Sequence, residues 1–376
     1  MKQKKHTGEP FMQLAIRLAR RGLGDVEPNP AVGAVIVKNG KLIGAGWHKK
    51  FGGPHAEINA LNDCRKHGES PKDAEMFVTL EPCCHYGKTG PCTKALIEAK
   101  IKKVFIAAID PSKHARGKGI RRLRKAGIDI KTGLCEREAK ILNAPFMKYA
   151  STNKPWVTLK WAQTIDGKLA WKKSAGKERW ISCEQSRRDV HNLRRQAGAI
   201  LVGINTVLKD DPLLTPRPVK GKRPIRIVLD NQLRIPVNCK LIKTIDDAPV
   251  LVVTGEQYLR TKKAKQLACK GVQLLGFPRV KSNLRFLLKH LSDVKIQHLI
   301  VEGGPKVLGA FIKENLADEI IIYISPVTAG RKGEADIDTA FEKGIRLYGA
   351  RIYDSGVDQK LKGYTKNGLK ALGIRQ

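Results

Sequence analysis

The sequence predicts two α/β domains, and three observations carry that prediction: its length, a repeated alternation of strands and helices, and a polar break near the middle. A chain of 376 residues is too long for one ordinary domain, and 41% hydrophobic residues suffice for two cores. Helices between successive strands imply crossover connections that place helices over a sheet. Ser151–Pro155 is polar and contains proline, so we expect a linker there. The predicted domains span residues 1–150 and 154–376.

The first half opens with a helix and a hairpin. Phe11, Leu14 and Leu18 recur at helical spacing before Gly22. Asn39-Gly40 separates two apolar runs, and both residues tolerate the positive φ angles of a type I′ turn, so the pattern predicts a hairpin. The expected elements that follow are a helix near His55–His67, a strand Met76–Leu80, a helix near Pro91–Ala99, a strand Val104–Ile109, a helix Gly119–Ala126 and a strand Ile128–Lys131.

The alternation restarts after the predicted linker, which indicates a second sheet covered by helices. We expect strands at Trp156–Trp161, Ala199–Val202, Ile225–Leu229, Val250–Val253, His298–Val301 and Asp318–Ile324. We expect helices at Glu184–Arg195, Glu256–Cys269, Asn283–His290 and Pro305–Glu314.

The chain is strongly basic, with 71 Lys and Arg against 35 Asp and Glu and a net charge of +36. The excess is spread along the chain, since residues 1–148 hold 29 basic and 14 acidic residues. Such charge raises nucleic-acid binding as a hypothesis. A generally basic surface that serves phosphorylated small molecules is the interpretation we favour, because no nucleic-acid motif accompanies the charge. We therefore expect no nucleic-acid partner.

Location and assembly follow from simpler features. The longest apolar runs are far shorter than the span of about 20 residues that a membrane helix needs, so no membrane partner is expected. The N-terminal residues are polar and charged, unlike a signal peptide. Eight cysteines in 376 residues are too sparse for a disulfide scaffold, which favours a reducing, cytoplasmic location. We also expect a homo-oligomer.

One constellation in the first half carries metal chemistry. His55-Ala56-Glu57 opens a helical pattern, Cys83 follows a strand and a proline, and Cys92 opens the next helix. One imidazole and two thiolates leave the fourth position of a tetrahedral zinc ion for water, whose pKa the metal lowers. Glu57 then occupies the general acid/base position of the His-x-Glu…Pro-Cys deaminase signature. We choose Cys83 over Cys84 as the ligand because Cys83 directly follows the proline.

The loop between the two cysteine ligands makes the likeness specific. Glu81-Pro82-Cys83-Cys84-His85-Tyr86-Gly87-Lys88-Thr89-Gly90-Pro91-Cys92 resembles the deaminase motif of the bifunctional riboflavin-biosynthesis deaminase/reductase family, although that family usually has Pro where Gly90 stands. Asn29–Val37 and Asp110-Pro111 resemble the same family. The resemblance implies a cytidine-deaminase-like three-layer domain that hydrolytically deaminates a phosphoribosylamino-diaminopyrimidinone, with one zinc ion per chain.

The same resemblance suggests how the deaminase half works. Glu57 would take the proton of the attacking water and pass it to the leaving ammonia. The candidate substrate-binding residues are Asn29, His48, His85, Lys88 and Asp110. Without the resemblance, Asn29 could equally be a turn residue and His48 a strand-end residue.

The second half lacks the Gly-x-Gly-x-x-Gly dinucleotide fingerprint. It has Glu302-Gly303-Gly304-Pro305 between a strand and a helix, where backbone N–H groups can approach a phosphate. Glycine in such a turn is common, so this signal alone is weak. Five further stretches resemble the reductase half of the same family in order: Lys160–Gly167, Trp180–Ser182, Leu193-Arg194, Val202–Arg217 and Ile225–Asp230. The stretch Lys168–Arg179 differs from the family pattern, and nothing is inferred from it.

The resemblance implies a dihydrofolate-reductase-like domain that uses NADPH to reduce the ribosyl group of the deaminated compound to ribityl. The implied cofactor-binding residues are Ala162, Trp180, Thr206, Asp210, Gly304, Pro305, Lys306, Val307, Leu308, Gly309 and Ala310. The implied substrate-binding residues are Arg194, Leu214, Arg217 and Glu302. Arg194 and Arg217 suit a phosphate because guanidinium groups bind phosphate oxygens in pairs.

Two alternatives belong to other classes of function. A zinc deaminase acting on nucleic acid would explain the positive charge, but it would leave the reductase-like half without a role. A binding protein with a purely structural zinc would normally have a fourth protein ligand, and Glu57 would have no task.

Overall fold

The computed structural model describes residues 8–86, 90–172, 180–217, 223–277, 283–337 and 344–375. The chain divides into two compact units, Met1–Asn153 and Lys154–Gln376. No helix within the described ranges is long and apolar enough to cross a membrane. Lys88, a predicted substrate-binding residue, lies outside the described ranges.

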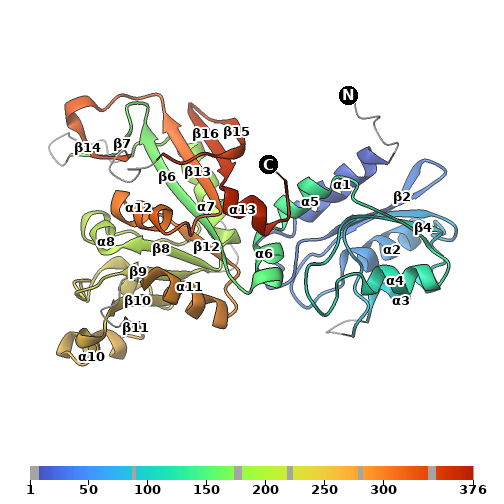
Figure 1. The fold of residues 1–376 in the computed structure, drawn as a ribbon, viewed down its shortest axis with the longest axis horizontal. Coiled ribbons are helices and arrows are strands. Elements are labelled where there is room, and N and C mark those ends of the chain that lie inside the picture. Colours follow the sequence, from blue (N-terminus) through green and yellow to red (C-terminus); the bar gives the residue numbers. More distant parts are fainter. Residues whose placement is uncertain are drawn as a thin grey trace. The chain divides into compact units, whose positions relative to one another are not determined.

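The first unit is a five-stranded sheet between two layers of helices. Its strands follow the order β2-β1-β3-β4-β5, with β1 antiparallel to both neighbours and β3, β4 and β5 parallel. Helices α1 and α5 cover one face, and α2, α3 and α4 cover the other (Figure 1). The elements are α1 (Glu9–Arg20), β1 (Gly33–Lys38), β2 (Lys41–Trp47), α2 (Ala56–Lys66), β3 (Glu75–Leu80), α3 (Cys92–Glu98), β4 (Lys103–Ala108), α4 (Lys118–Lys125), β5 (Asp129–Thr132), α5 (Glu136–Leu142) and α6 (Ala144–Thr152).

The predicted hairpin is confirmed, because Asn39 and Gly40 join β1 and β2 with φ angles of 50° and 76°. The predicted linker is partly wrong. Helix α6 continues through Ser151 and Thr152, whose hydroxyl groups donate to carbonyl oxygens one turn earlier instead of breaking the helix. The helix ends at Asn153, which has a φ of 52°.

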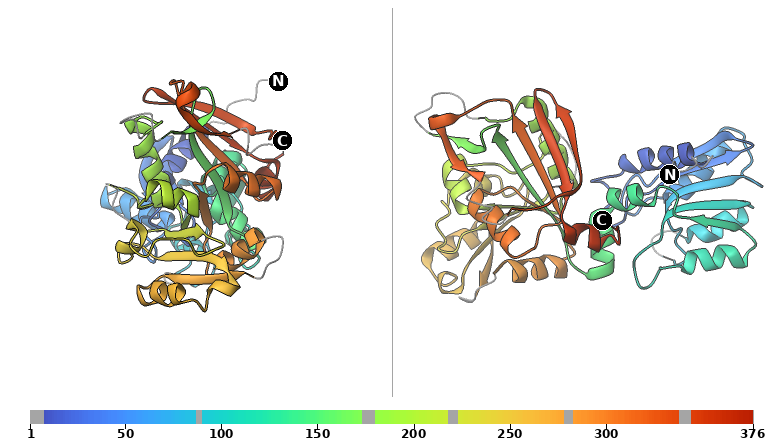
Figure 2. Two further views of the ribbon diagram at one scale, coloured as in Figure 1. Left: turned by 90° about the vertical axis from the view of Figure 1, so that its left-hand side faces the viewer. Right: turned by 45° about the horizontal axis from the view of Figure 1, so that its top comes forward.

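The second unit is built on a nine-stranded sheet in the order β11-β10-β9-β8-β12-β6-β13-β16-β15. The seven strands from β11 to β13 are parallel, whereas β16 and β15 continue the sheet in antiparallel fashion. Figure 2 shows the red hairpin β15–β16 and the gold strands β10 and β11 at opposite edges. A separate two-stranded ribbon pairs β7 with β14. Both α/β architectures expected from the sequence are thus present.

The strands of the second unit are β6 (Trp156–Thr164), β7 (Lys168–Trp171), β8 (Ala199–Gly203), β9 (Ile225–Leu229), β10 (Val250–Gly255), β11 (Gln273–Phe277), β12 (His298–Val301), β13 (Glu319–Ser325), β14 (Gly333–Asp336), β15 (Tyr348–Ser355) and β16 (Asp358–Tyr364). Its helices are α7 (Glu184–Gln196), α8 (Ile204–Asp210), α9 (Lys240–Lys243), α10 (Lys262–Cys269), α11 (Asn283–Asp293), α12 (Pro305–Lys313) and α13 (Lys366–Ala371), with short 3-10 turns η2 (Glu256–Tyr258) and η3 (Gly330–Lys332).

Alternate residues of the central strands face two different cores, as the pleat of a sheet requires. Leu201 and Leu299 pack with residues of α11 and α12 on one side. Ile200 and Ile300 pack with residues of α9 and α10 on the other. Helices therefore cover both faces of the parallel part of the sheet.

The predicted helix over Glu256–Cys269 is wrong in its first turn. The chain makes the short turn η2 and then begins α10 at Lys262. The hydroxyl oxygen of Thr261 accepts a hydrogen bond of 3.2 Å from the backbone N–H of Ala264. That cap fixes where the helix begins.

Candidate active sites

The first unit brings His55, Cys83 and Cys92 together. His55 is the N-cap of α2, Cys83 lies in the turn after β3, and Cys92 is the first residue of α3. The Nδ1 atom of His55 lies 3.5 Å from the Cys83 Sγ atom and 3.3 Å from the Cys92 Sγ atom. All three candidate ligand atoms lie within 4.8 Å of one another.

These distances fit a tetrahedral zinc ion. Zinc–nitrogen and zinc–sulfur bonds of about 2.1 and 2.3 Å place neighbouring ligand atoms of a tetrahedron about 3.6 Å apart. The three protein ligands leave a fourth position open, which is typical of catalytic rather than structural zinc. The backbone N–H of Cys92 donates to the Cys83 Sγ atom over 3.3 Å, as expected for a thiolate at the start of a helix.

Glu57 lies in the first turn of α2, only 3% exposed, and does not belong to the group of three ligands. Burial raises the pKa of its carboxyl group to about 7, and the negative charge of Cys83 acts in the same direction. A carboxyl group with such a pKa can accept a proton and release it again near neutral pH.

One predicted substrate-binding residue of this unit, His48, lies beside the metal ligand His55, and a second, Asn29, contacts His48. The His48 ring packs edge-on against the His55 ring at 5.2 Å between centroids. The Nδ1 atom of His48 lies 3.0 Å from the carbonyl oxygen of Pro54, which can only accept, so this nitrogen carries the proton. The Nε2 atom therefore accepts from the Asn29 side-chain amide over 3.2 Å.

The other two described candidates make their contacts elsewhere. His85 is exposed, and its ring lies 5.4 Å from that of His114. Asp110 accepts hydrogen bonds from the backbone N–H of Ser112, at 2.8 Å, and from the Ser112 hydroxyl group. Asp110 thus supports its own loop in this structure.

Glu81 has a role that the sequence analysis missed. Its carboxylate accepts backbone hydrogen bonds from Gly117 at 2.9 Å, Ile120 at 3.2 Å and Asp110 at 3.3 Å. These bonds join the turn that carries Cys83 to the start of α4. The approach is close, because a Cβ atom on Gly119 would lie 2.1 Å from the Pro82 carbonyl oxygen. A buried acid directly before Pro-Cys was the available signal.

The second unit contains a cavity of about 1610 Å³ that includes the carboxyl ends of β6, β8, β9 and β12 and the start of α12. Ligands bind at this edge of open α/β sheets. Pockets for small ligands are usually about 300–1,000 Å³, so this cavity has room for a nucleotide and a second molecule. Its lining includes these predicted residues: Ala162, Trp180, Arg194, Thr206, Asp210, Leu214, Arg217, Glu302, Gly304, Pro305, Lys306, Val307 and Ala310.

The side chain of Leu308, predicted to bind the cofactor, does not face the cavity. It is fully buried and packs in the core against strand residues. It lies one residue beyond Val307, and on a helix that step turns the side chain away from the cavity. Gly309 contributes no side chain.

A group of three charges lies in the cavity wall. Glu302 accepts two hydrogen bonds of 2.8 Å from the Nε and Nη2 atoms of Arg194, and the Lys160 Nζ atom lies 3.7 Å from its Oε2 atom. Burial alone would raise the pKa of Glu302, but the positive charges of Arg194 and Lys160 outweigh it and lower that pKa to about 2. The guanidinium fork of Arg194, expected to bind phosphate, is directed at Glu302 instead.

Arg217 keeps an exposed side chain, while its backbone N–H donates to the His191 Nδ1 atom over 3.0 Å. Burial, together with the charges of Arg194 and Arg217, lowers the pKa of His191 to about 4, so this ring is neutral near pH 7. Glycine at position 303 allows close packing, since a Cβ atom there would lie 2.7 Å from the Cβ atom of Val307.

Two protein-family models match the chain. Residues 5–108 match the cytidine and deoxycytidylate deaminase zinc-binding region, and residues 155–358 match the RibD C-terminal domain. A riboflavin biosynthesis protein RibD from Aquifex aeolicus is 47% identical over 355 residues, 93% of this chain and 96% of the relative. The chain belongs to the RibD family.

Other RibD proteins agree with this assignment. The RibD of Escherichia coli is 39% identical over 338 residues, 86% of this chain and 88% of that protein. A solved structure of Acinetobacter baumannii RibD matches with a TM-score of 0.82 at 36% identity, covering 96% of this chain and 99% of that one. A Thermotoga maritima structure, described as a diaminohydroxyphosphoribosylaminopyrimidine deaminase/5-amino-6-(5-phosphoribosylamino)uracil reductase, matches with a TM-score of 0.80 at 35% identity and the same coverage.

The family resemblance expected from the sequence is thus confirmed. This RibD family member is a bifunctional enzyme of riboflavin biosynthesis, with a zinc-binding deaminase unit and a reductase unit. The zinc-binding region includes His55, Cys83 and Cys92, whose geometry fits the ion. The reductase unit implies a nicotinamide cofactor, and its cavity is large enough for one.

Proposed function

We propose that the first unit hydrolyses an amino group from 2,5-diamino-6-(5-phosphoribosylamino)pyrimidin-4(3H)-one and that the second unit reduces the product with NADPH. The final product would be 5-amino-6-(5-phosphoribitylamino)uracil. The observation that carries the proposal is the presence in one chain of two different sites: three zinc ligands beside a buried acid, and a large cavity whose wall holds Lys160, Arg194 and Glu302. The printed activity of the Thermotoga relative supplies the substrate class.

In the deaminase site, one zinc ion per chain would be held by His55, Cys83 and Cys92 and would supply Lewis-acid activation of water. Glu57 would accept the proton of the attacking water and deliver it to the departing amine, so that water and the amino compound become a carbonyl and ammonia. Asn29 and His48, joined by their 3.2 Å contact, would orient the pyrimidine ring. The substrate-binding role of His85, Lys88 and Asp110 remains a prediction.

In the reductase site, NADPH would lie along the carboxyl edge of the sheet. Backbone N–H groups at the start of α12, a helix of nine residues beginning at Pro305, would face its diphosphate. Thr206, Asp210, Ala162 and Trp180 would contact the remainder of the nucleotide, as their places in the cavity wall permit. The cofactor would give a hydride to the first carbon of the ribose, and the opened ring oxygen would take a proton.

The substrate phosphate would be bound by Arg217, which is exposed and lies in the cavity wall. Arg194 would instead keep Glu302 ionised and in place through its two hydrogen bonds. Leu214 and Glu302 would contact the reacting part of the substrate. We propose a small phosphorylated substrate in place of a nucleic acid, and the expected homo-oligomer stays a prediction.

A direct assay tests this function. Purified protein is mixed with the diaminopyrimidine substrate, with and without NADPH, and ammonia release and NADPH oxidation are recorded separately. We expect ammonia in both mixtures and NADPH oxidation only after ammonia appears. Ammonia release from a single-stranded RNA or DNA, with none from the diaminopyrimidine, would overturn the proposal.

A further inference from the structure

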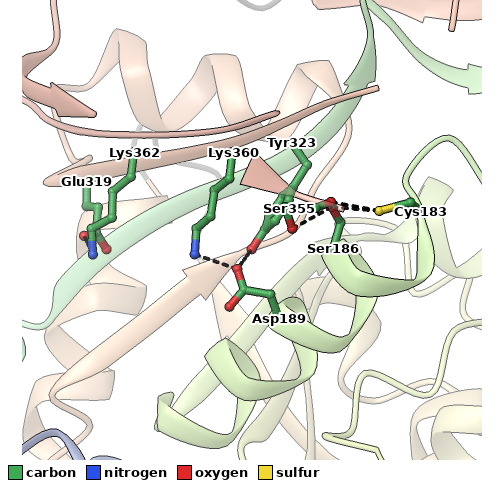
Figure 3. Close-up of polar contacts among 8 residues, drawn as sticks. All are labelled: Cys183, Ser186, Asp189, Glu319, Tyr323, Ser355, Lys360 and Lys362. Atoms are coloured by element: carbon green, nitrogen blue, oxygen red, sulfur yellow. Dashed lines mark hydrogen bonds and ion pairs between the residues drawn. The ribbon is translucent and has the colours of Figure 1, made fainter. Parts of the chain in front are cut away.

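One face of the second sheet carries three lysines beneath helix α7. The register of the strands places Lys160 and Lys362 opposite Ile321 on either side, and Lys360 opposite Tyr323. Each lysine faces its own acid: the shortest N–O distances are 3.7 Å from Lys160 to Glu302, 2.6 Å from Lys360 to Asp189, and 2.7 Å from Lys362 to Glu319. Figure 3 shows the last two pairs side by side. The first pair alone belongs to the cavity wall.

Tyr323 lies between the cavity lysine and its neighbour. Its side chain is fully buried, and its hydroxyl group donates to the Asp189 Oδ2 atom over 2.6 Å. The centre of its ring is 5.6 Å from the Lys160 Nζ atom and 5.7 Å from the Lys360 Nζ atom. Both distances are within the range of a cation–π contact. The Oδ2 atom of Asp189 thus accepts hydrogen bonds from both Tyr323 and Lys360, as Figure 3 shows.

Helix α7, which carries Asp189, is anchored at its start. The backbone N–H of Cys183 donates to the Asp358 Oδ2 atom over 2.8 Å, and the Ser186 hydroxyl group donates to the Ser355 Oγ atom over 3.0 Å. These contacts hold the first turn of α7 against β15 and β16, and Figure 3 shows those that Cys183 and Ser186 make with Ser355. The position of Asp189 on the sheet is therefore set by contacts at the start of α7, and the position of the Tyr323 ring follows from Asp189.

We propose that Tyr323 is a positioning residue for the reductase reaction: fixed by Asp189, its ring holds the Lys160 ammonium group beside Glu302 in the cavity wall. The inference rests on the proposed reductase function. Tyr323 does not belong to the residues that line the cavity, so it acts through Lys160 and touches neither substrate nor cofactor. On the side away from Glu302, the ring gives the buried ammonium group a polarisable aromatic face that cannot accept its proton.

The charges around Lys160 explain why one ring matters. Glu302 and Asp189 favour its charged form, whereas Arg194 opposes it, and Lys360 stands across the Tyr323 ring. His191 on α7 is neutral, as described above. Burial lowers the pKa of Lys160, with the charge of Glu302 opposing that effect. Removing the ring takes away one stabilising contact of the cation, so it should lower the pKa of Lys160 further.

The test compares four variants of the full chain. Tyr323→Met removes the ring but fills the core, and Tyr323→Phe keeps the ring but not the hydroxyl group. Asp189→Asn removes the charge that anchors the ring from a side chain that is 32% exposed, so it should not disturb folding. Tyr364→Met is the matched control, because the Tyr364 ring has the same contact with Lys362, at 5.8 Å, on the same sheet face but outside the cavity wall.

The readout is the pH profile of NADPH oxidation with the deaminated substrate supplied. Tyr323→Met should lower kcat about tenfold and move the alkaline limb of the profile down by about 0.5–1 pH unit, the size of a cation–π contact. Its KM for NADPH should stay within about twofold. Asp189→Asn should move the limb in the same direction by less. Tyr323→Phe, which loses the anchoring hydrogen bond to Asp189 but keeps the ring, should move the limb by no more than Asp189→Asn, and Tyr364→Met should keep the wild-type limb. Ammonia release, the activity of the other unit, should be unchanged in all four, and the retained KM for NADPH reports that the second unit is folded.

Two results would overturn the inference. One is an alkaline limb in Asp189→Asn that coincides with that of the wild type, and this variant decides the question if Tyr323→Met does not fold. The other is an equal shift in Tyr323→Met and Tyr364→Met, which would indicate a general effect on the sheet. If the wild-type protein itself oxidised no NADPH with this substrate, the proposed function would fail before the inference is reached.

Discussion

Arg194 and Glu302, 108 positions apart in the sequence, are joined by two parallel hydrogen bonds of 2.8 Å in the wall of the reductase cavity. Their side chains are 14% and 9% exposed, and Lys160 adds a second positive charge 3.7 Å from the carboxylate. A buried carboxylate with two cationic partners keeps its charge down to acid pH. The pair should therefore stabilise the second unit, and removing either partner should leave a buried charge without its counter-charge.

Glu302→Gln should destabilise the second unit by about 3 kcal/mol, because it leaves two buried cations without a counter-charge. Urea denaturation followed by tryptophan fluorescence measures this loss. Lys209→Gln is a suitable control, since it breaks a more exposed ion pair to Glu334 and should cost less than about 1 kcal/mol. Equal losses in the two variants would contradict the importance given to the Glu302 charge.

The same variant predicts a pH dependence. The pKa of Glu302 is lowered from 4.5 to about 2 in the folded protein, so its stabilising contribution is fully present above the unfolded value of 4.5. The contribution disappears as the pH falls from about 4.5 to about 2, where the folded carboxylate takes a proton. The difference in unfolding free energy between wild type and Glu302→Gln should therefore shrink between pH 6 and pH 3. A difference that grows on acidification would contradict the ion pair.

The metal ligands can be separated from the acid beside them. Cys83→Ser should lose the zinc that elemental analysis finds in the wild type at about one ion per chain. Glu57→Gln should retain the zinc and lose about 10²- to 10⁴-fold in ammonia release, the range for general acid–base catalysis. Cys84→Ser is the control that should keep both. Wild-type deamination by Glu57→Gln would remove Glu57 from the chemistry.

Arg217→Ala should weaken reduction of the phosphorylated substrate by about 10- to 150-fold in kcat/KM, because one charged hydrogen-bond partner is lost. Ammonia release and zinc content should not change. The loss should be much smaller for a substrate that lacks the phosphate. If both substrates suffer equally, Arg217 acts on the fold or on the nucleotide.

The two units should also fold separately. Each has its own sheet and its own buried cluster, and the chain passes between them at Asn153 and Lys154. Fragments 1–153 and 154–376 should each show a cooperative thermal transition, and the first should release ammonia without NADPH. Insolubility of both fragments, with a stable full chain, would indicate that the units depend on each other.

Local signals carried much of the sequence analysis. Asn39-Gly40 predicts its hairpin because only a few residue types accept two positive φ angles. His55, Cys83 and Cys92 could be found because zinc ligation demands specific residue types at a recognisable spacing, and the structure brings their ligand atoms within 4.8 Å of one another.

Other features depend on partners far away in the sequence. Strand β16 contains Lys360 and Lys362, which look like solvent-facing residues until α7 and β13 supply Asp189 and Glu319. The fork of Arg194 suggested a phosphate, because nothing near it in the sequence pointed to Glu302. The sequence predicts a linker where α6 continues, because Thr152 donates its hydroxyl hydrogen to the carbonyl oxygen of Lys148. Polar residues make such bonds in turns as readily as in helices.

The most direct test of two successive reactions in one chain uses Glu57→Gln and Glu302→Gln side by side with the diaminopyrimidine substrate and NADPH. We expect Glu57→Gln to release ammonia and oxidise NADPH at least about 100-fold more slowly than the wild type, but to oxidise NADPH normally once the deaminated compound is supplied. We expect Glu302→Gln to release ammonia at the wild-type rate and to oxidise no NADPH with either compound. Oxidation of NADPH by Glu57→Gln with the unmodified diaminopyrimidine, at the wild-type rate, would contradict the proposed order and the division of labour between the two units.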